Sequence, residues 1–145
     1  MEQVFYATAV AYHGCGILIR GPSGSGKSDL ALRLIEDGAN LIADDQVNIK
    51  AVRKQLYLSS PDNISGLIEV RGFGVIKIEC VRDIKLCLIV DLDPSYETER
   101  TPIMKDELIQ DIITPIINIK AFESSVLARI KLILGYIEKK IELIS

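Results

Sequence analysis

The sequence has little of what marks membrane, secreted or nucleic-acid-binding proteins. No apolar run approaches the roughly 20 residues needed to span a bilayer, and the N-terminus has no basic region followed by an apolar core and a cleavage site. The 17 Lys and Arg residues are scattered and outnumbered by 20 Asp and Glu residues, which argues against binding nucleic acid through counterion release. We therefore expect a cytoplasmic protein with neither a membrane nor a nucleic acid as partner.

Cysteine is scarce too. The three cysteines are odd in number and have no CxxC spacing, which argues against a disulfide framework or a zinc knuckle. What the chain does have is an apolar fraction of 48% in 145 residues, enough for one core but hardly for two. We expect a single domain over residues 1–145.

The apolar pattern predicts an α/β fold with a mixed sheet. Strands are expected over residues 4–12 and 17–20, joined as a hairpin by the glycines of HGCG. A helix is expected from Lys27 to a stop at Gly38, followed by a short buried strand over residues 41–43 and partly exposed strands within residues 47–58. The run IKLCLIVDL predicts the most buried strand, at the centre of the sheet.

The second half of the chain has weaker patterns. Residues 93–107 are polar and contain proline, so we expect a surface loop. Apolar residues then recur at helical spacing up to the C-terminus, which predicts an amphipathic helix: Ile130, Leu134, Ile137, Ile141 and Ile144. Its apolar stripe is expected to pack on the sheet, with a membrane or partner contact as the alternative.

A phosphate-binding motif lies between the second strand and the first helix. Its pattern is G-x-x-x-x-G-K-[ST], and its residues are Gly21, Pro22, Ser23, Gly24, Ser25, Gly26, Lys27 and Ser28. Glycines let successive N–H groups turn toward phosphate oxygens, and the helix N-terminus adds its positive dipole end. We expect Lys27 to bind the β- and γ-phosphates of ATP and the Ser28 hydroxyl to ligate Mg²⁺.

Two aspartates follow the next expected strand. Asp44 and Asp45 come directly after residues 41–43, and the carboxyl ends of strands are where an open α/β sheet presents its ligands. One carboxylate would lie near Mg²⁺, and the other could position an attacking hydroxyl and accept its proton. The alternative is that the pair only caps or turns the chain.

The motif, the sequence LIADD behind it and the later run EVRGFG together resemble the HPr kinase/phosphorylase family. The resemblance covers the first half of the chain well and the second half thinly. It implies a catalytic domain like that of phosphoenolpyruvate carboxykinase and transfer of phosphate from ATP to a serine of the small carrier protein HPr. Because the long form of the family begins with a separate N-terminal domain, we expect this chain to resemble the short form, similar to that of alphaproteobacteria.

The resemblance also implies roles for individual residues. Asp45 would be the base that takes the serine proton, with Asp44 beside it. Glu69, in EVRG, falls where the family has a second metal ligand, and the stretch 69–78 would form part of the catalytic wall. Arg100 falls where the family has an arginine near the transferring phosphate, where a guanidinium stabilises charge on the equatorial oxygens.

Two departures from the family bear on activity. The family's histidine that assists the catalytic acid aligns with Tyr6, while His13 falls in the hairpin turn and should not inherit that role. The region TPIINIKAFESS has no proline-glycine-arginine-asparagine segment, which the long form uses to remove phosphate. Kinase activity is therefore expected, and phosphorylase activity is doubtful.

Three functions remain open from the sequence. The first is an ATP- and Mg²⁺-dependent serine kinase acting on HPr or an HPr-like carrier. The second is an ATP-sensing interaction module with little phosphotransfer, because Tyr6 stands where the family has histidine. The third is a small-molecule kinase of the same general fold. Family members assemble into rings, so a homo-oligomer is also expected.

Overall fold

The computed structural model describes residues 2–93, 104–140, 142 and 144. The first half of the chain contains β1 (Glu2–Phe5), β2 (Thr8–Tyr12), β3 (Cys15–Arg20), α1 (Lys27–Glu36), β4 (Asn40–Ala43), β5 (Val47–Val52), β6 (Gln55–Ser59) and the short 3₁₀ helix η1 (Asp62–Ile64). The second half contains β7 (Leu67–Val70), β8 (Gly74–Lys77), β9 (Ile84–Leu92), β10 (Lys105–Ile109), β11 (Ile112–Ile119) and α2 (Val126–Ile137).

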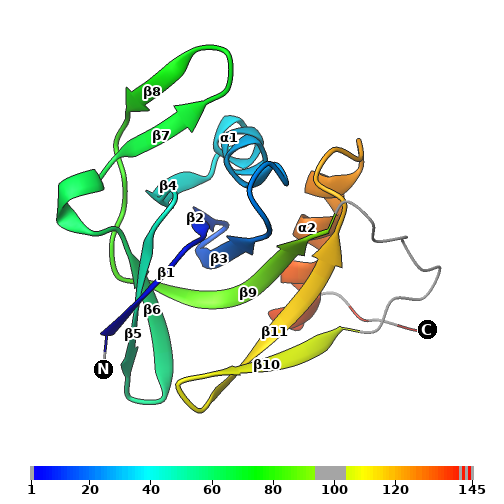
Figure 1. Ribbon diagram of the computed structural model, residues 1–145. Helices are drawn as coiled ribbons and strands as arrows, with labels where there is room; N and C mark the ends of the chain where they lie inside the picture. Colours follow the sequence, from blue (N-terminus) through cyan, green and yellow to red (C-terminus); the bar gives the residue numbers. More distant parts are fainter. Residues whose placement is uncertain (1, 94–103, 141, 143, 145) are drawn as a thin grey trace.

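The strands form one curled mixed sheet and a separate hairpin (Figure 1). The main sheet runs β1-β5-β6-β9-β3-β2-β4, and β11 also pairs with β9 and carries β10 on its outer side. β9 is parallel to β3 and β11 and antiparallel to β6. The prediction that β9 lies at the centre of the sheet is therefore confirmed.

Three hairpins of the main sheet turn through two residues with positive φ. Only the β2–β3 turn uses glycine, with φ of +50° at His13 and +78° at Gly14. The β5–β6 turn consists of residues 53–54 and the β10–β11 turn of residues 110–111. Positive φ at both central residues is the type I′ pattern, which matches the right-handed twist of the strands.

The core has two parts, one on each face of the sheet. Successive residues of β3 alternate between them: Ile17 and Ile19 pack with α1 and α2, whereas Leu18 packs with β4, β5 and β6. This alternation is the period-two pattern of a strand buried on both faces. Leu30 and Leu34 of α1 and Ile130 and Leu134 of α2 are buried, so the helices cover one face and these parts of the expected apolar stripes are confirmed. Ile141, which is also expected in the second stripe, lies outside the described residues.

Three expected boundaries are wrong. The strand expected over residues 4–12 is broken before Ala7 into β1 and β2, because β1 pairs with β5 and β2 pairs with β3 and β4. The loop expected over residues 93–107 ends early, since residues 105–107 pair with β11 as part of β10. The C-terminal helix stops at Ile137, and Ile144 is 83% exposed.

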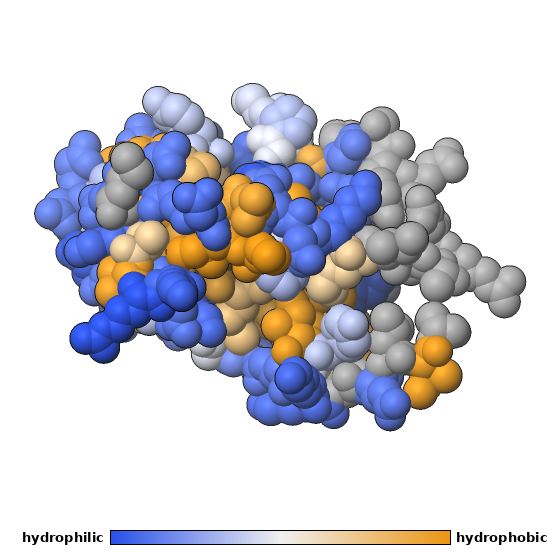
Figure 2. Space-filling model, turned by 90° about the horizontal axis from the view of Figure 1, so that it is seen from below, coloured by the Kyte–Doolittle hydropathy of each residue, from blue (hydrophilic) through white to orange (hydrophobic). Residues whose placement is uncertain are grey.

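Two features of the structure concern a membrane or another protein as partner. No helix in the described parts of the chain is long and apolar enough to cross a membrane. Seen from below, an apolar area interrupts the polar surface at the end of the molecule that holds the β5–β6 and β10–β11 hairpins (Figures 1 and 2). Val52, Leu108 and Ile113 are exposed apolar residues of these hairpins. Such areas are typical of protein contact surfaces, and the expected assembly of copies stays a prediction.

Candidate active site

The glycine-rich loop connects the end of β3 to the start of α1, as the motif predicts. Gly21 has φ of +158°, and a Cβ atom there would lie 2.5 Å from Ser25 Oγ and 2.9 Å from the carbonyl oxygen of Leu92. Gly26, the N-cap of α1, has φ of +100°. A side chain at either position would therefore distort the loop.

The N-terminus of α1 has free donors. No side chain in the part of the chain that the structure describes caps this helix, and the first helical bond runs from Leu30 N–H to the carbonyl of Gly26. The preceding N–H groups of the first turn therefore have no intrahelical acceptor. Ser25 Oγ is buried and has no hydrogen-bond partner among the described residues. This arrangement suits an anion, because N–H groups and the helix dipole both favour negative charge.

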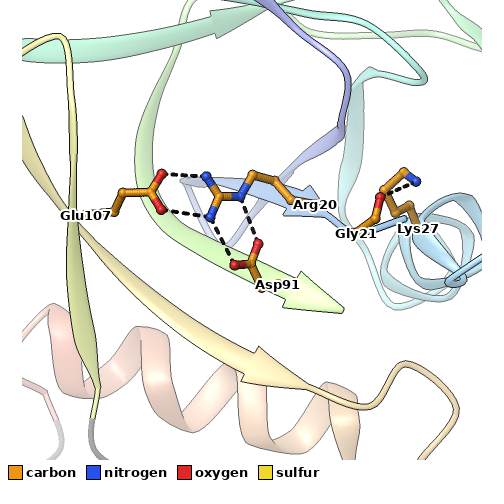
Figure 3. Close-up of polar contacts among 5 residues, drawn as sticks. All are labelled: Arg20, Gly21, Lys27, Asp91 and Glu107. Atoms are coloured by element: carbon orange, nitrogen blue, oxygen red, sulfur yellow. Dashed lines mark hydrogen bonds and ion pairs between the residues drawn. The ribbon is translucent and has the colours of Figure 1, made fainter. Parts of the chain in front are cut away.

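Lys27 lies folded over the loop. Its Nζ donates to the carbonyl oxygen of Gly21 at 2.8 Å (Figure 3). It also donates to the carbonyl oxygen of Pro22 at 3.2 Å. The ammonium group is thus close to the loop backbone, where a bound polyphosphate would meet it.

Asp44 connects the loop to two other parts of the fold. Its Oδ1 accepts hydrogen bonds from Ser28 Oγ at 2.7 Å and from Thr8 Oγ1 at 2.9 Å, and its Oδ2 accepts from the N–H of Glu69 at 3.0 Å. Asp44 is only 8% exposed. The contact with Ser28 therefore joins the loop to Asp44, the first of the two aspartates.

Asp45 lies beside Asp44 but differs in its surroundings. It is exposed, has φ of +72°, and its carbonyl oxygen accepts a hydrogen bond from Ala7 N–H at 3.2 Å. An aspartate tolerates this left-handed conformation better than most residues. The turn therefore leaves Asp44 buried against Ser28 and Asp45 exposed.

Glu69 reaches the site through the β7–β8 hairpin. Its N–H binds Asp44, while its side chain is exposed on β7. The neighbouring Ile68 packs in the core with α1, which fixes the hairpin beside the loop. The described residues contain no cluster of three or more His, Cys, Asp or Glu side chains that could hold a metal ion. Ser28 and Asp44 present hydroxyl and carboxylate oxygens, which are the kind of ligand that Mg²⁺ prefers.

Two residues that the sequence analysis did not select support the site. The first is Thr8, whose hydroxyl orients Asp44. The second is Arg20, the last residue of β3, which is held by Asp91 and Glu107 (Figure 3). The sequence indicates neither role, because the partners of Thr8 and Arg20 lie far away along the chain.

The Arg20 contacts are bidentate on both sides. Nε and Nη2 donate to Asp91 at 2.8 and 3.0 Å, and Nη1 and Nη2 donate to Glu107 at 2.5 and 2.9 Å. Hydrogen bonds to Asp91 and to Glu107 raise the pKa of the Arg20 guanidinium. Because Arg20 precedes Gly21 directly, these bonds fix the first residue of the loop to β9 and β10.

The remaining predicted residues lie apart or outside the described residues. Tyr6 is 79% exposed and precedes Ala7, which binds the Asp45 carbonyl. His13 stacks edge-on against Tyr12 in the β2–β3 turn and does not contact the aspartates. Arg100 lies outside the residues that the structure describes.

Comparisons with known sequences address the family. The family model described as HPr Serine kinase C-terminal domain matches residues 1–121. The HPr kinase/phosphorylase of Clostridium tetani is 48% identical over 77 residues, which cover 53% of this chain and 25% of that protein. The HPr kinase/phosphorylase of Chlorobium luteolum is 37% identical over 98 residues, which cover 62% of this chain and 30% of that protein. The chain thus spans about a quarter to a third of the length of these relatives.

A solved structure agrees in fold. The Hpr(Ser) kinase/phosphatase from Coxiella burnetii matches with a TM-score of 0.83 and 25% sequence identity, over 96% of this chain and 99% of that one. The family match covers most of the chain, including the loop, the aspartates and the β7–β8 hairpin. This chain therefore belongs to the HPr serine kinase C-terminal domain family.

Proposed function

We propose that this chain is an ATP- and Mg²⁺-dependent kinase that phosphorylates a serine of HPr or of an HPr-like carrier protein. The observation that carries the proposal is the 2.7 Å contact between Ser28 Oγ and Asp44 Oδ1. It joins the end of the glycine-rich loop to the end of β4. Hydrogen-bond donors that suit a polyphosphate and a buried carboxylate therefore lie in one site.

The residues present fit a magnesium-bound nucleotide. The unpartnered Ser25 Oγ and the uncapped first turn of α1 offer donors to phosphate oxygens. Ser28 and Asp44 offer hard oxygens to Mg²⁺, and the resemblance adds the Glu69 carboxylate as a second ligand. The metal neutralises negative charge on the phosphates when it is bound.

The protein's own residues would divide the reaction as follows. Lys27 leaves the carbonyls of Gly21 and Pro22 to bind phosphate oxygens. Asp45, which is exposed, accepts the proton of the incoming serine hydroxyl. The serine oxygen bonds to the γ-phosphorus of ATP, and ADP leaves with the electrons of the broken P–O bond. Arg100 would stabilise charge on the transferred group.

The experiment that tests the proposal is transfer of labelled phosphate from ATP to the organism's HPr-like protein. Asp45→Asn should abolish transfer while nucleotide binding persists, because asparagine keeps the turn but cannot accept the proton. Asp111→Asn is the matched control, since Asp111 is also exposed, has φ of +63°, and lies in the β10–β11 turn. Transfer by Asp45→Asn at the parent rate would contradict the assignment of the base.

One observation favours a second candidate, an ATP-sensing module. Tyr6 stands where the resemblance places a histidine, one residue before Ala7, whose N–H binds the Asp45 carbonyl, so the imidazole that would assist the catalytic acid is missing. Nucleotide-dependent binding of the carrier without turnover would favour this candidate. Turnover with a metabolite but not with the carrier would instead favour a small-molecule kinase.

A further inference from the structure

An exposed aromatic side chain lies against the first residue of α1. Phe122 follows β11 and is 68% exposed. A Cβ atom at Gly26 would lie 2.8 Å from Phe122 Cζ and 3.0 Å from Ala121 Cβ. The edge of the Phe122 ring therefore touches the glycine-rich loop while most of the ring stays accessible.

The backbone on both sides of Phe122 is tied to α1. Arg33 donates from Nη1 to the carbonyl oxygen of Ala121 at 2.5 Å and from Nη2 to that of Glu123 at 3.3 Å. Ala121 is buried in the core that α1 and α2 share, and the Glu123 side chain binds Arg129 at 2.6 Å. The position of Phe122 is thus set by its neighbours rather than by burial of its own ring.

A ring that is fixed in place yet exposed to water is suited to binding a flat ligand. Its face offers a large apolar surface, and few torsions need to be fixed when a ligand stacks on it. The position next to Gly26 restricts what that ligand is, because Gly26 begins the turn of α1 whose N–H groups suit phosphate. A group attached to those phosphates would emerge beside the ring.

We infer that Phe122 is the stacking platform for the base of the nucleotide whose phosphates the glycine-rich loop binds. This inference rests on the proposed function, because it takes a polyphosphate on the loop as given. The ligand class is a nucleoside triphosphate, in which the ribose joins the phosphates at Gly26 to a base on the Phe122 ring. Stacking explains why the chain keeps a large apolar side chain in water at this position.

The test compares a ligand that has a base with one that has none. Binding of Mg-ATP and of Mg-tripolyphosphate to the whole chain is measured by calorimetry for the parent, Phe122→Ala and Phe122→Tyr. Leu132→Ala is the matched control, because Leu132 is also an exposed apolar side chain and lies on α2. Thermal unfolding of each variant establishes that the fold is retained.

The expected result is selective. Phe122→Ala weakens ATP binding by roughly 5- to 150-fold, the range measured for loss of a base–aromatic stack, and leaves tripolyphosphate binding unchanged. Phe122→Tyr, which keeps a ring, and Leu132→Ala bind both ligands like the parent. Equal weakening of both ligands by Phe122→Ala, or weakening of neither, would overturn the inference: the ring would then order the loop or contact a protein.

A spectroscopic measurement gives an independent readout. The chain contains no tryptophan, so Phe122→Trp introduces a single tryptophan, whose emission can be excited apart from that of the five tyrosines. Its emission should be quenched by Mg-ATP and not by Mg-tripolyphosphate, and an identical response to both would contradict stacking. If the parent binds neither ligand, the proposed function fails; if it binds both with equal affinity, only the stacking platform fails.

Discussion

Replacement of Thr8 by valine tests how the inward aspartate is held. Thr8 is 1% exposed, and its hydroxyl donates to Asp44 Oδ1 at 2.9 Å. Valine keeps the shape and the strand preference of threonine but removes the donor. After the change, Asp44 keeps the hydrogen bonds from Ser28 and from the N–H of Glu69.

The magnitude follows from the charge of the acceptor. A hydrogen bond to a charged group contributes about 1.5–3 kcal/mol, so Thr8→Val should lower the free energy of unfolding by about 2 kcal/mol. Thr8→Ser keeps the hydroxyl and loses one buried methyl group, which costs about 1 kcal/mol. The order of stability should therefore be parent, then Thr8→Ser, then Thr8→Val.

Urea unfolding measures these differences, and a double-mutant cycle with Asp44→Asn assigns them. When Asp44 is already asparagine, Thr8→Val removes only a hydrogen bond between neutral groups. The loss of unfolding free energy in the double variant should therefore be smaller than the sum of the two single losses by about 1 kcal/mol. Thr8→Val should also raise the Mg²⁺ concentration for half-maximal transfer by about tenfold, as loss of a group that orients a metal ligand does. Equal stability of parent and Thr8→Val, or strict additivity with Asp44→Asn, would refute the reasoning.

Three further predictions concern stability. Arg53 and Lys54 have φ of +51° and +63° in the β5–β6 turn, so Arg53→Asn with Lys54→Gly should raise stability by roughly 1 kcal/mol; an unchanged thermal midpoint would contradict this. Leu88 is fully buried at the centre of the sheet, and Leu88→Ala should lose about 2–5 kcal/mol in urea, whereas a loss below about 1 kcal/mol would place it outside the core. Burial raises the pKa of the Cys15 thiol, with its contact to Glu138 adding to the effect. The unfolded thiol therefore loses its proton first, and stability should fall as pH rises above about 8.5, less steeply in Cys15→Ala than in the parent; equal slopes would contradict the assignment.

Much of the fold could be predicted because it depends on local chemistry. The glycines between β3 and α1, the helical stripe of Leu30 and Leu34, and the apolar run of β9 each specify their element without reference to distant residues. The errors fall where distant partners decide. The strand breaks before Ala7 because β1 pairs with β5, and β10 begins as early as Lys105 because it pairs with β11. No local sequence pattern contains this information on pairing.

The candidate site divides in the same way. The sequence placed Ser28 and the aspartate pair near one another, since a loop and a strand end meet at the same edge of the sheet. It did not say which of the two aspartates is buried. The structure does, because the turn that gives Asp45 a φ of +72° leaves that residue exposed while Asp44 is buried.

By itself, the sequence determined that a strand, a glycine-rich loop and a helix follow one another and that two carboxylates come after the next strand. Only the tertiary structure decided what surrounds them: Thr8, Ser28 and Glu69 reach Asp44 from 36, 16 and 25 residues away. The physical reason is the distance along the sequence over which each effect acts. Periodicity and turn chemistry act over a few residues, whereas the partners of a buried carboxylate are set by strand register and packing across the whole sheet.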